Sequence, residues 1–299
     1  MTPKRKFSSF GYVHIFQITA DRGVCFYSAA DCLVWFTKLC ILAVKYDVKI
    51  LAVCIMLNHF HIEARFSSFT NMFRMMQELD SWFTVVYNRE QGRSGALFQG
   101  KYGSAIKFKA NKIRENFIYI GNNPVVKKAV SKAEDYRWNF LKYAREKHPF
   151  SEKIGSKGNS RALLCALAEI RRCRTASLPI SYSFFRGIYQ QLERRERLQV
   201  LDYIVAQYDV IDHSALLNMW GGYKQMCSAL HTVSGAEYDL KDDTASEDYR
   251  HYFRMIDLAH RHGIRLGWSC PESVKKRLAR LFQDEVGASA LEISKLLHI

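Results

Sequence analysis

Two histidines separated by a single residue, His59 and His61, are the side chains of this sequence best suited to chemistry. They lie in the segment Met56-Leu-Asn-His-Phe-His-Ile-Glu63, which is typical of a turn followed by a strand. Side chains at positions i and i+2 of a strand point to the same face, so the two imidazoles would lie side by side. Neutral imidazoles on a rigid strand are good ligands for a divalent cation. A hydrogen-bonded histidine pair without a metal is the alternative that this spacing leaves open.

A second His-x-His motif shows that spacing alone does not decide. The chain has 10 histidines, and His260 and His262 repeat the same separation. Their segment has helical periodicity, and on a helix positions i and i+2 diverge by about 200°. This second pair therefore cannot chelate as the strand pair would.

Tyr119 and Asn123 form the second candidate constellation. On a helix, residues at i and i+4 share a face, so a phenol would lie beside an amide oxygen. This arrangement resembles a nucleophile next to a third metal ligand. The chain has 16 tyrosines, and most tyrosines serve packing, which is the competing interpretation. Pro124 disfavours helical geometry at Asn123.

The elements that must position these residues alternate between strands and helices in the first half of the chain. Asn58 is expected at a tight turn between two strands. The order βαββαβα fits an α+β fold, a ferredoxin-like antiparallel sheet with helices on one face. We expect strands at residues 12–19, 49–57, 59–66 and 97–108, and helices at 29–46, 69–89 and 111–122.

The second half of the chain has a helical pattern. Residues 147–160 are rich in Pro, Gly, Ser and Lys and predict a linker, which divides the chain into domains 1–148 and 149–299. The second domain is expected to be an all-helical accessory domain that binds DNA or a partner. Residues 272–283 and 287–299 resemble the first two helices of a helix-turn-helix. The expected helices span residues 161–173, 182–206, 214–230, 247–262, 271–284 and 289–298.

The charge is uneven along the chain. The 44 Lys and Arg against 29 Asp and Glu give a net charge of +15. Residues 1–150 hold 23 basic and 11 acidic side chains, whereas residues 151–299 hold 21 and 18. A basic surface on a folded domain favours a polyanionic partner such as nucleic acid or an anionic membrane surface.

Composition excludes several classes of protein. With 48% hydrophobic and 13% aromatic residues the chain can build a core, so it is not disordered. The longest apolar run, Ile50 to Leu57, is much shorter than the roughly 20 residues of a membrane-spanning helix. The eight cysteines include no Cys-x-x-Cys pair, which argues against a zinc ribbon or a disulfide framework and favours a reducing cytoplasm.

Taken together, the motifs of residues 12–140 resemble a known family. The run His59-Phe60-His61 is similar to the His-hydrophobe-His motif of the HUH single-strand nucleases. Its context is similar to the single-tyrosine (Y1) transposases, which include the insertion-sequence-200-like enzymes and the REP-associated tyrosine transposases. The further matching segments, in chain order, are Ala52–Asn58, Arg93–Tyr102, Tyr119–Val125 and Asp135–Trp138.

The resemblance implies a metal-dependent single-stranded DNA endonuclease and strand transferase, a transposase. Tyr119 would be the nucleophile that forms a covalent 5′-phosphotyrosine intermediate, and His59, His61 and Asn123 would hold Mg²⁺ or Mn²⁺. Glu63 departs from the family pattern, which usually has an apolar residue there, and is a candidate extra ligand because it shares the face of both histidines. The implied partners are single-stranded DNA that contains a hairpin and a second copy of the chain, with a cytoplasmic, nucleoid-associated location.

Basic residues around the tyrosine helix are expected to follow the DNA backbone. They are Lys101, Lys107, Lys109, Lys112, Arg114, Lys127 and Lys128. Two other functions remain open at this point. One is a non-catalytic single-stranded nucleic-acid-binding protein on the same fold, and the other is a metal-dependent hydrolase that acts through bound water, with Tyr119 structural.

Overall fold

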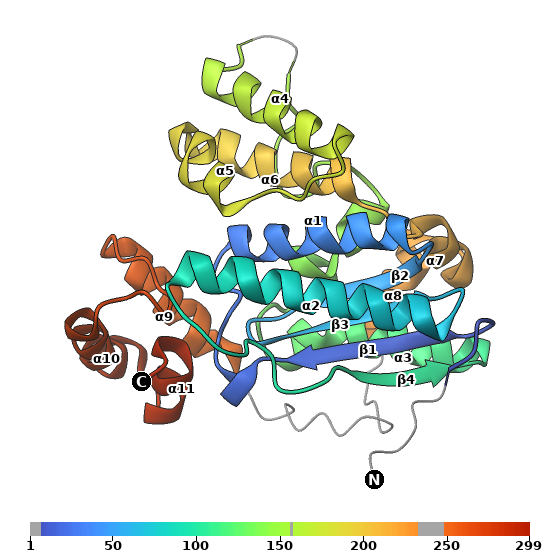
Figure 1. The fold of residues 1–299 in the computed structure, drawn as a ribbon, viewed down its shortest axis with the longest axis horizontal. Coiled ribbons are helices and arrows are strands. Elements are labelled where there is room, and N and C mark those ends of the chain that lie inside the picture. The colour runs from blue at the N-terminus through green and yellow to red at the C-terminus, as the bar shows by residue number, and fades with distance from the viewer. Residues whose placement is uncertain (1–6, 156–157, 233–247) are drawn as a thin grey trace.

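The computed structural model describes residues 7–155, 158–232 and 248–299 (Figure 1). Among these residues four strands form one antiparallel sheet in the order β2-β3-β1-β4, surrounded by helices, which confirms the predicted α+β class. The strands are β1 (Tyr12–Ile18), β2 (Lys49–Ile55), β3 (His59–Arg65) and β4 (Gly103–Lys107). The strand expected at residues 97–108 is shorter than predicted, because Gly100 has a φ of 64° and interrupts the extended backbone. Before this glycine, Phe98 makes only an isolated bridge to Thr19.

Two long helices cover one face of the sheet. Helices α1 (Ala29–Lys45) and α2 (Phe69–Gln91) run side by side across it (Figure 1). Ser28 and Ser68 cap their amino ends through side-chain oxygens, which satisfies backbone N–H groups that have no partner inside the helix. Gly92 ends α2 with a φ of 60°, a conformation that glycine adopts without strain.

The strands present two different faces. Val13 and Ile62 point toward α1 and α2 and are fully buried in the apolar core there. Their sequence neighbours His14, His61 and Glu63 point the other way, because successive strand residues alternate between faces. These three side chains are also fully buried.

Helix α3 (Ala110–Val126), which carries Tyr119, packs against β2, β3 and β4 on this second face. The expectation that the helices lie on one face of the sheet is therefore wrong. The physical reason is that β3 is buried on both sides from His59 to Ala64, and a sheet with two buried faces needs a covering layer on each.

Helix α3 continues through Pro124, although this proline was expected to disfavour helical geometry at Asn123. The backbone N–H of Lys127 donates to the carbonyl of Asn123 (3.0 Å), and that of Ala129 donates to Pro124 (2.8 Å). Proline removes one helical hydrogen bond, and here this loss falls in the last turns of the helix. Asn123 is thus held on the helix, four residues after Tyr119.

The segment predicted as a linker, residues 147–160, contains no helix or strand in its described part. It is nevertheless tied down, because the buried carboxylate of Asp202 accepts hydrogen bonds from the Phe150 backbone (3.0 Å) and the Ser151 hydroxyl (2.8 Å). The chain also contains short 3-10 helices. Those described are Ala20–Arg22, Ala133–Asp135, Arg137–Asn139, Leu141–Ala144 and Ile188–Gln191.

Helices α4 (Arg161–Thr175), α5 (Tyr182–Arg186) and α6 (Arg194–Tyr208) extend the core of the first face beyond α1 (Figure 1). The single helix predicted over residues 182–206 is broken into two pieces. Gly187, with φ −97° and ψ −96°, lies outside the helical region and separates them.

The later helices form a second core together with α3. They are α7 (His213–Trp220), α8 (Tyr223–Thr232), α9 (Tyr249–Arg261), α10 (Glu272–Val286) and α11 (Ala290–Leu297). The helix predicted over residues 214–230 is interrupted by Gly221, whose φ of 76° ends α7. Helices α10 and α11 are joined by residues 287–289 and pack against α9.

Both halves of the chain contribute to both cores. The division into domains 1–148 and 149–299 stays a prediction, as does a DNA-binding role for α10 and α11. In the ranges described, every helix is too short or too polar to serve as a membrane span.

Candidate functional site

The histidine pair lies on β3, as the sequence predicted. In the antiparallel ladder with β1, His59 is opposite Ile18 and His61 is opposite Phe16. The two ring centroids are 5.1 Å apart, and the side chains are 1% and 0% exposed. The imidazoles are therefore neighbours on the second face of the sheet, shielded from bulk water.

Asn123 reaches both imidazoles from α3. Its Oδ1 lies 3.2 Å from Nε2 of His59, and its Nδ2 lies 3.2 Å from Nε2 of His61. The sheet and the helix thus bring the three predicted ligands together at one point, with the Nε2 atoms of both rings directed at the same amide.

The far nitrogens of both rings are also held. Nδ1 of His59 lies 2.7 Å from Oδ1 of Asn58, and Nδ1 of His61 lies 3.0 Å from Nε2 of His14. Asn58 is oriented by its own Nδ2, which donates to the Arg22 carbonyl (3.0 Å). An amide oxygen only accepts hydrogen bonds, so Nδ1 of His59 is the protonated nitrogen of that contact.

This arrangement suits a cation between the rings. With Nδ1 of His59 protonated, the neutral ring carries its lone pair on Nε2, and that atom faces the lone pairs of Asn123 Oδ1. Two lone pairs in contact require a second proton on His59 or a cation between them. Outer hydrogen bonds of this kind are the usual support of histidine ligands, so the donor set fits a divalent ion.

Glu63 takes a different place from the one expected of an extra ligand. It lies directly opposite His14 in the ladder between β1 and β3 and is fully buried. Among the described residues, no three His, Cys, Asp or Glu side chains are placed to share one metal ion. Glu63 is therefore outside a common ligand set with His59 and His61.

Tyr119 packs against the histidine cluster. Its ring centroid is 5.5 Å from that of His61 and 5.8 Å from that of His14, with the rings edge to face. The side chain is half-buried. The helix thus places the phenol beside the imidazoles and on the same face as Asn123.

Three residues of this cluster were not found by sequence reasoning: His14, Asn58 as a side chain, and Tyr249. The hydroxyl of Tyr249, at the start of α9, donates to Oδ1 of Asn58 (2.7 Å). The sequence signal that could have identified the Asn58 side chain is its position directly before His59. His14 and Tyr249 carry no local signal, because their partners lie 47 and 191 residues away in sequence.

The predicted DNA-binding cations separate into two groups. Lys101, Lys109, Lys112, Arg114 and Lys128 are exposed, whereas Lys107 and Lys127 are 2% and 1% exposed. The two buried lysines are not placed where they can follow a DNA backbone along the surface.

Several of the exposed cations already have protein partners. Lys112 pairs with Glu115 (2.7 Å), and Lys128 pairs with Asp248 (3.1 Å). Arg114 donates to the Met219 carbonyl (2.8 Å). Lys101 and Lys109 are also exposed, and they are the two predicted cations best placed to contact DNA.

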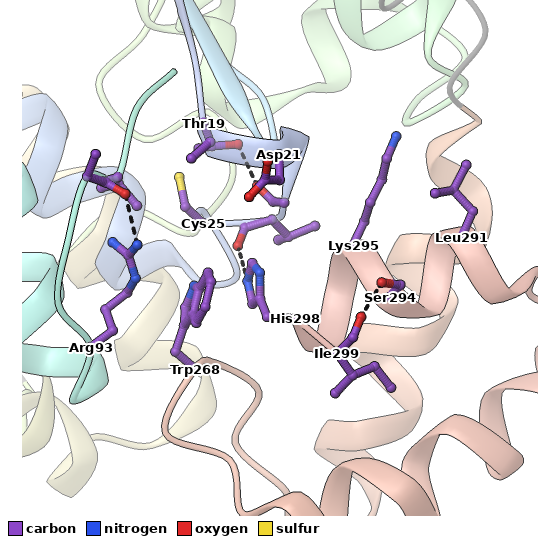
Figure 2. A pocket seen from close by; sticks show the side chains of 15 residues that line it. Thr19, Asp21, Cys25, Arg93, Trp268, Leu291, Ser294, Lys295, His298 and Ile299 are labelled. Carbon is purple, nitrogen blue, oxygen red and sulfur yellow. Dashed lines mark hydrogen bonds between the residues drawn. The ribbon is translucent and has the colours of Figure 1, made fainter. Parts of the chain in front are cut away.

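A cavity of about 350 Å³ lies near the turn that precedes His59 (Figure 2). Its wall residue Thr19 donates to the Asn58 carbonyl through its backbone N–H (2.9 Å). Trp268 lies between the guanidinium of Arg93, 4.6 Å from the ring centroid, and the His298 ring, stacked at 3.7 Å. Burial lowers the pKa of His298 to about 4, so this ring is neutral near neutral pH. Both faces of Trp268 are thus occupied within the protein.

Comparison with known proteins adds little. No protein-family model and no curated protein matches the chain. The solved structure of a REP-associated tyrosine transposase bound to a REP hairpin aligns with 54% of this chain and 96% of its own, at 12% identity and a TM-score of 0.41. A likeness this weak does not assign a function to the chain.

Proposed function

We propose that this protein cuts and rejoins single-stranded DNA through a covalent 5′-phosphotyrosine on Tyr119, with a divalent metal ion as cofactor. The observation that carries the proposal is the convergence of His59, His61 and Asn123 on one point, with the Tyr119 ring packed against the same cluster. A buried polar cluster of this size is costly for folding unless it is fully hydrogen-bonded, and the outer contacts of both rings supply that support.

The reaction exchanges one phosphodiester for another. The Tyr119 oxygen attacks phosphorus, the bond from phosphorus to the 3′-oxygen breaks, and the phenol proton is balanced by the proton that the leaving 3′-hydroxyl gains. The downstream strand stays attached through its 5′-phosphate. Attack by the same or another 3′-hydroxyl reverses the step, so no external energy source is needed.

The metal site would consist of His59, His61 and Asn123, binding Mg²⁺ or Mn²⁺. Such an ion supplies positive charge that polarises the phosphate and offsets negative charge in the transition state. The protein's own contribution is to fix the imidazole lone pairs through Asn58 and His14 and to hold the phenol beside them.

The proposal extends to fold and partners. A ferredoxin-like sheet is supported by the strand order β2-β3-β1-β4 with α1 and α2 as crossovers on one face. Exposed Lys109, which directly precedes α3, and exposed Lys101, two residues before β4, suit the backbone of a single strand. A hairpin in that strand, a homodimer and a nucleoid-associated, cytoplasmic location belong to the same hypothesis and rest on the sequence motifs.

The experiment is capture of a covalent adduct. The full chain is incubated with Mn²⁺ or Mg²⁺ and a library of 3′-labelled single strands that contain a hairpin with randomised flanks. Because the downstream fragment stays on the protein, the 3′ label is expected to co-migrate with the protein under denaturing conditions. The adduct should disappear in Tyr119→Phe, in His59→Ala and with chelator.

Matched controls come from the chain. Tyr12 is a half-buried tyrosine on the same sheet face, and His260 belongs to the exposed second His-x-His motif; Tyr12→Phe and His260→Ala should both keep the adduct. If the protein binds the library but forms no adduct, the result would favour a non-catalytic nucleic-acid-binding protein over an enzyme. Metal-dependent cleavage that survives Tyr119→Phe would replace it with a water-activating hydrolase.

A further inference from the structure

A buried tyrosine of the second half of the chain contacts the support of the first histidine. Tyr249 is the first residue of α9 and is 1% exposed. Its hydroxyl donates to Oδ1 of Asn58 (2.7 Å), the same oxygen that accepts from Nδ1 of His59 (2.7 Å). We propose that Tyr249 is a positioning residue for His59, so that the helical second half of the chain is required for metal binding. This inference rests on the proposed function.

The role follows from the symmetry of an amide group. The Asn58 side chain can present either its oxygen or its nitrogen to His59, since the two ends have nearly the same shape. With Oδ1 toward the ring, Nδ1 of His59 keeps a proton and the lone pair stays on Nε2. With Nδ2 toward the ring, Nδ1 must accept, the proton moves to Nε2, and that atom can no longer bind a cation.

Two hydrogen bonds select the productive orientation of Asn58. Its Nδ2 donates to the Arg22 carbonyl (3.0 Å), and its Oδ1 accepts from Tyr249. A hydroxyl can also accept, so the Tyr249 bond selects orientation only in concert with the Arg22 carbonyl, which never donates. Without the phenol, Oδ1 of Asn58 loses a donor that helps to fix this orientation.

The chain holds the Tyr249 phenol firmly against the site. The backbone N–H of Tyr249 donates to the Lys127 carbonyl (2.8 Å), at the end of the helix that carries Tyr119 and Asn123. The preceding residue, Asp248, pairs with Lys128 (3.1 Å). The start of α9 is therefore fixed to α3 as well as to the turn before His59, and one residue ties the ligands on sheet and helix to the second half of the chain.

The structural alternative is that Tyr249 only fills space in the second core. Its ring does pack there, 5.6 Å from that of Tyr252. Packing depends on the ring, whereas orientation of Asn58 depends on the hydroxyl, so Tyr249→Phe separates the two roles.

The test uses Mn²⁺ binding to the full chain, measured by titration calorimetry and by electron paramagnetic resonance. Loss of an outer partner of a ligating histidine weakens metal binding about 10- to 100-fold. Tyr249 acts on His59 through Asn58, so we expect Tyr249→Phe to weaken binding about 10-fold, at the lower end of this range. The control is Tyr27→Phe, because the Tyr27 hydroxyl makes an equally short buried bond between the two halves, to the Leu296 carbonyl (2.7 Å). Tyr27→Phe should keep the wild-type affinity.

Two further measurements tie the effect to Asn58. In ¹⁵N spectra of the metal-free protein, His59 should carry its proton on Nδ1 in wild type and as a mixture of both tautomers in Tyr249→Phe. The double variant Tyr249→Phe/Asn58→Ala should bind Mn²⁺ no more weakly than Asn58→Ala alone, because residues that act through one another are not additive.

The outcomes separate this inference from the function beneath it. A wild-type protein that does not bind Mn²⁺ overturns the metal site itself. A wild-type protein that binds Mn²⁺, with unchanged affinity and tautomer in Tyr249→Phe, overturns the role of Tyr249 alone. Equal losses in Tyr249→Phe and Tyr27→Phe would show that only the general packing of the two halves matters.

Discussion

The two faces of the same strand, β3, are built for different purposes. Phe60 and Ile62 point toward α1 and α2, where Phe60 packs at 4.4 Å between ring centroids against Trp35. His59 and His61 alternate with them and point toward α3, into a cluster of hydrogen-bonded polar side chains. All four are buried to 1% exposure or less.

This difference separates stability from function. Burial of an apolar side chain stabilises the folded state. Burial of a polar group destabilises it unless every hydrogen bond that the group made to water is replaced within the protein. The second face would fold more simply with apolar residues. The imidazoles of this face are therefore the residues to which the proposed function assigns a role.

The largest expected effect comes from truncating one side chain on each face of β3. Phe60→Ala should lower the free energy of unfolding by about 3–5 kcal/mol, as for other buried phenylalanines, and the folded fraction should still bind Mn²⁺. His61→Ala should abolish Mn²⁺ binding at a smaller cost, about 1–3 kcal/mol for the partner left unsatisfied. Urea denaturation and metal titration of both variants measure the two quantities.

The contrast between the faces would fail if the two variants behaved alike. If His61→Ala lost as much stability as Phe60→Ala and still bound Mn²⁺, the polar cluster would be a structural element. Loss of metal binding in folded Phe60→Ala would show that the ligands depend on the core behind them.

A smaller effect should distinguish exposed from buried cations around the second face. Each phosphate contact to single-stranded DNA contributes about −0.7 to the slope of log K against log salt. Lys101→Ala or Lys109→Ala should reduce the magnitude of this slope by about that amount. Lys107→Met should leave it unchanged, because Lys107 is buried opposite Tyr12. A slope altered by Lys107→Met alone would mean that DNA reaches the buried face.

The smallest expected effect concerns the first face, where α2 carries a half-buried acid, Asp80. Burial raises the pKa of Asp80 to about 7, and its Oδ1 has no hydrogen-bond partner among the residues that the structure describes. A folded pKa above the unfolded value means that the folded state binds the proton more tightly, so this group destabilises the protein progressively as pH rises from about 4 to about 7. Asp80→Asn should remove that decline and be more stable than wild type at pH 8. Parallel pH profiles of unfolding free energy for the two proteins would contradict this assignment.

Local pattern was enough to predict most of the first half of the chain, including the positions of the candidate site residues. The alternation of His59, Phe60 and His61 placed both imidazoles on one face, and helical spacing placed Tyr119 beside Asn123. These predictions succeed because they depend only on the 2.0 and 3.6 periodicities of strand and helix.

The features that the sequence did not predict depend on long-range packing or on the conformation of single backbone positions. His14 joins His61 only through the register of β1 with β3, and Tyr249 joins Asn58 only once α9 packs on α3. Gly187 breaks a predicted helix at a residue that helices often tolerate. No periodicity shows which face a helix covers, which is why α3 was placed on the wrong one.

The proposed function requires Tyr119 to become covalently linked to DNA. Trypsin should release Tyr119 in the peptide of residues 115–127, which contains a single tyrosine. After adduct formation with Mn²⁺ and nuclease digestion, mass spectrometry of the tryptic peptides is expected to find the remaining 5′-phosphonucleotide on this peptide. Attachment to any other peptide, or cleaved DNA with no modified peptide, would show that Tyr119 is not the nucleophile.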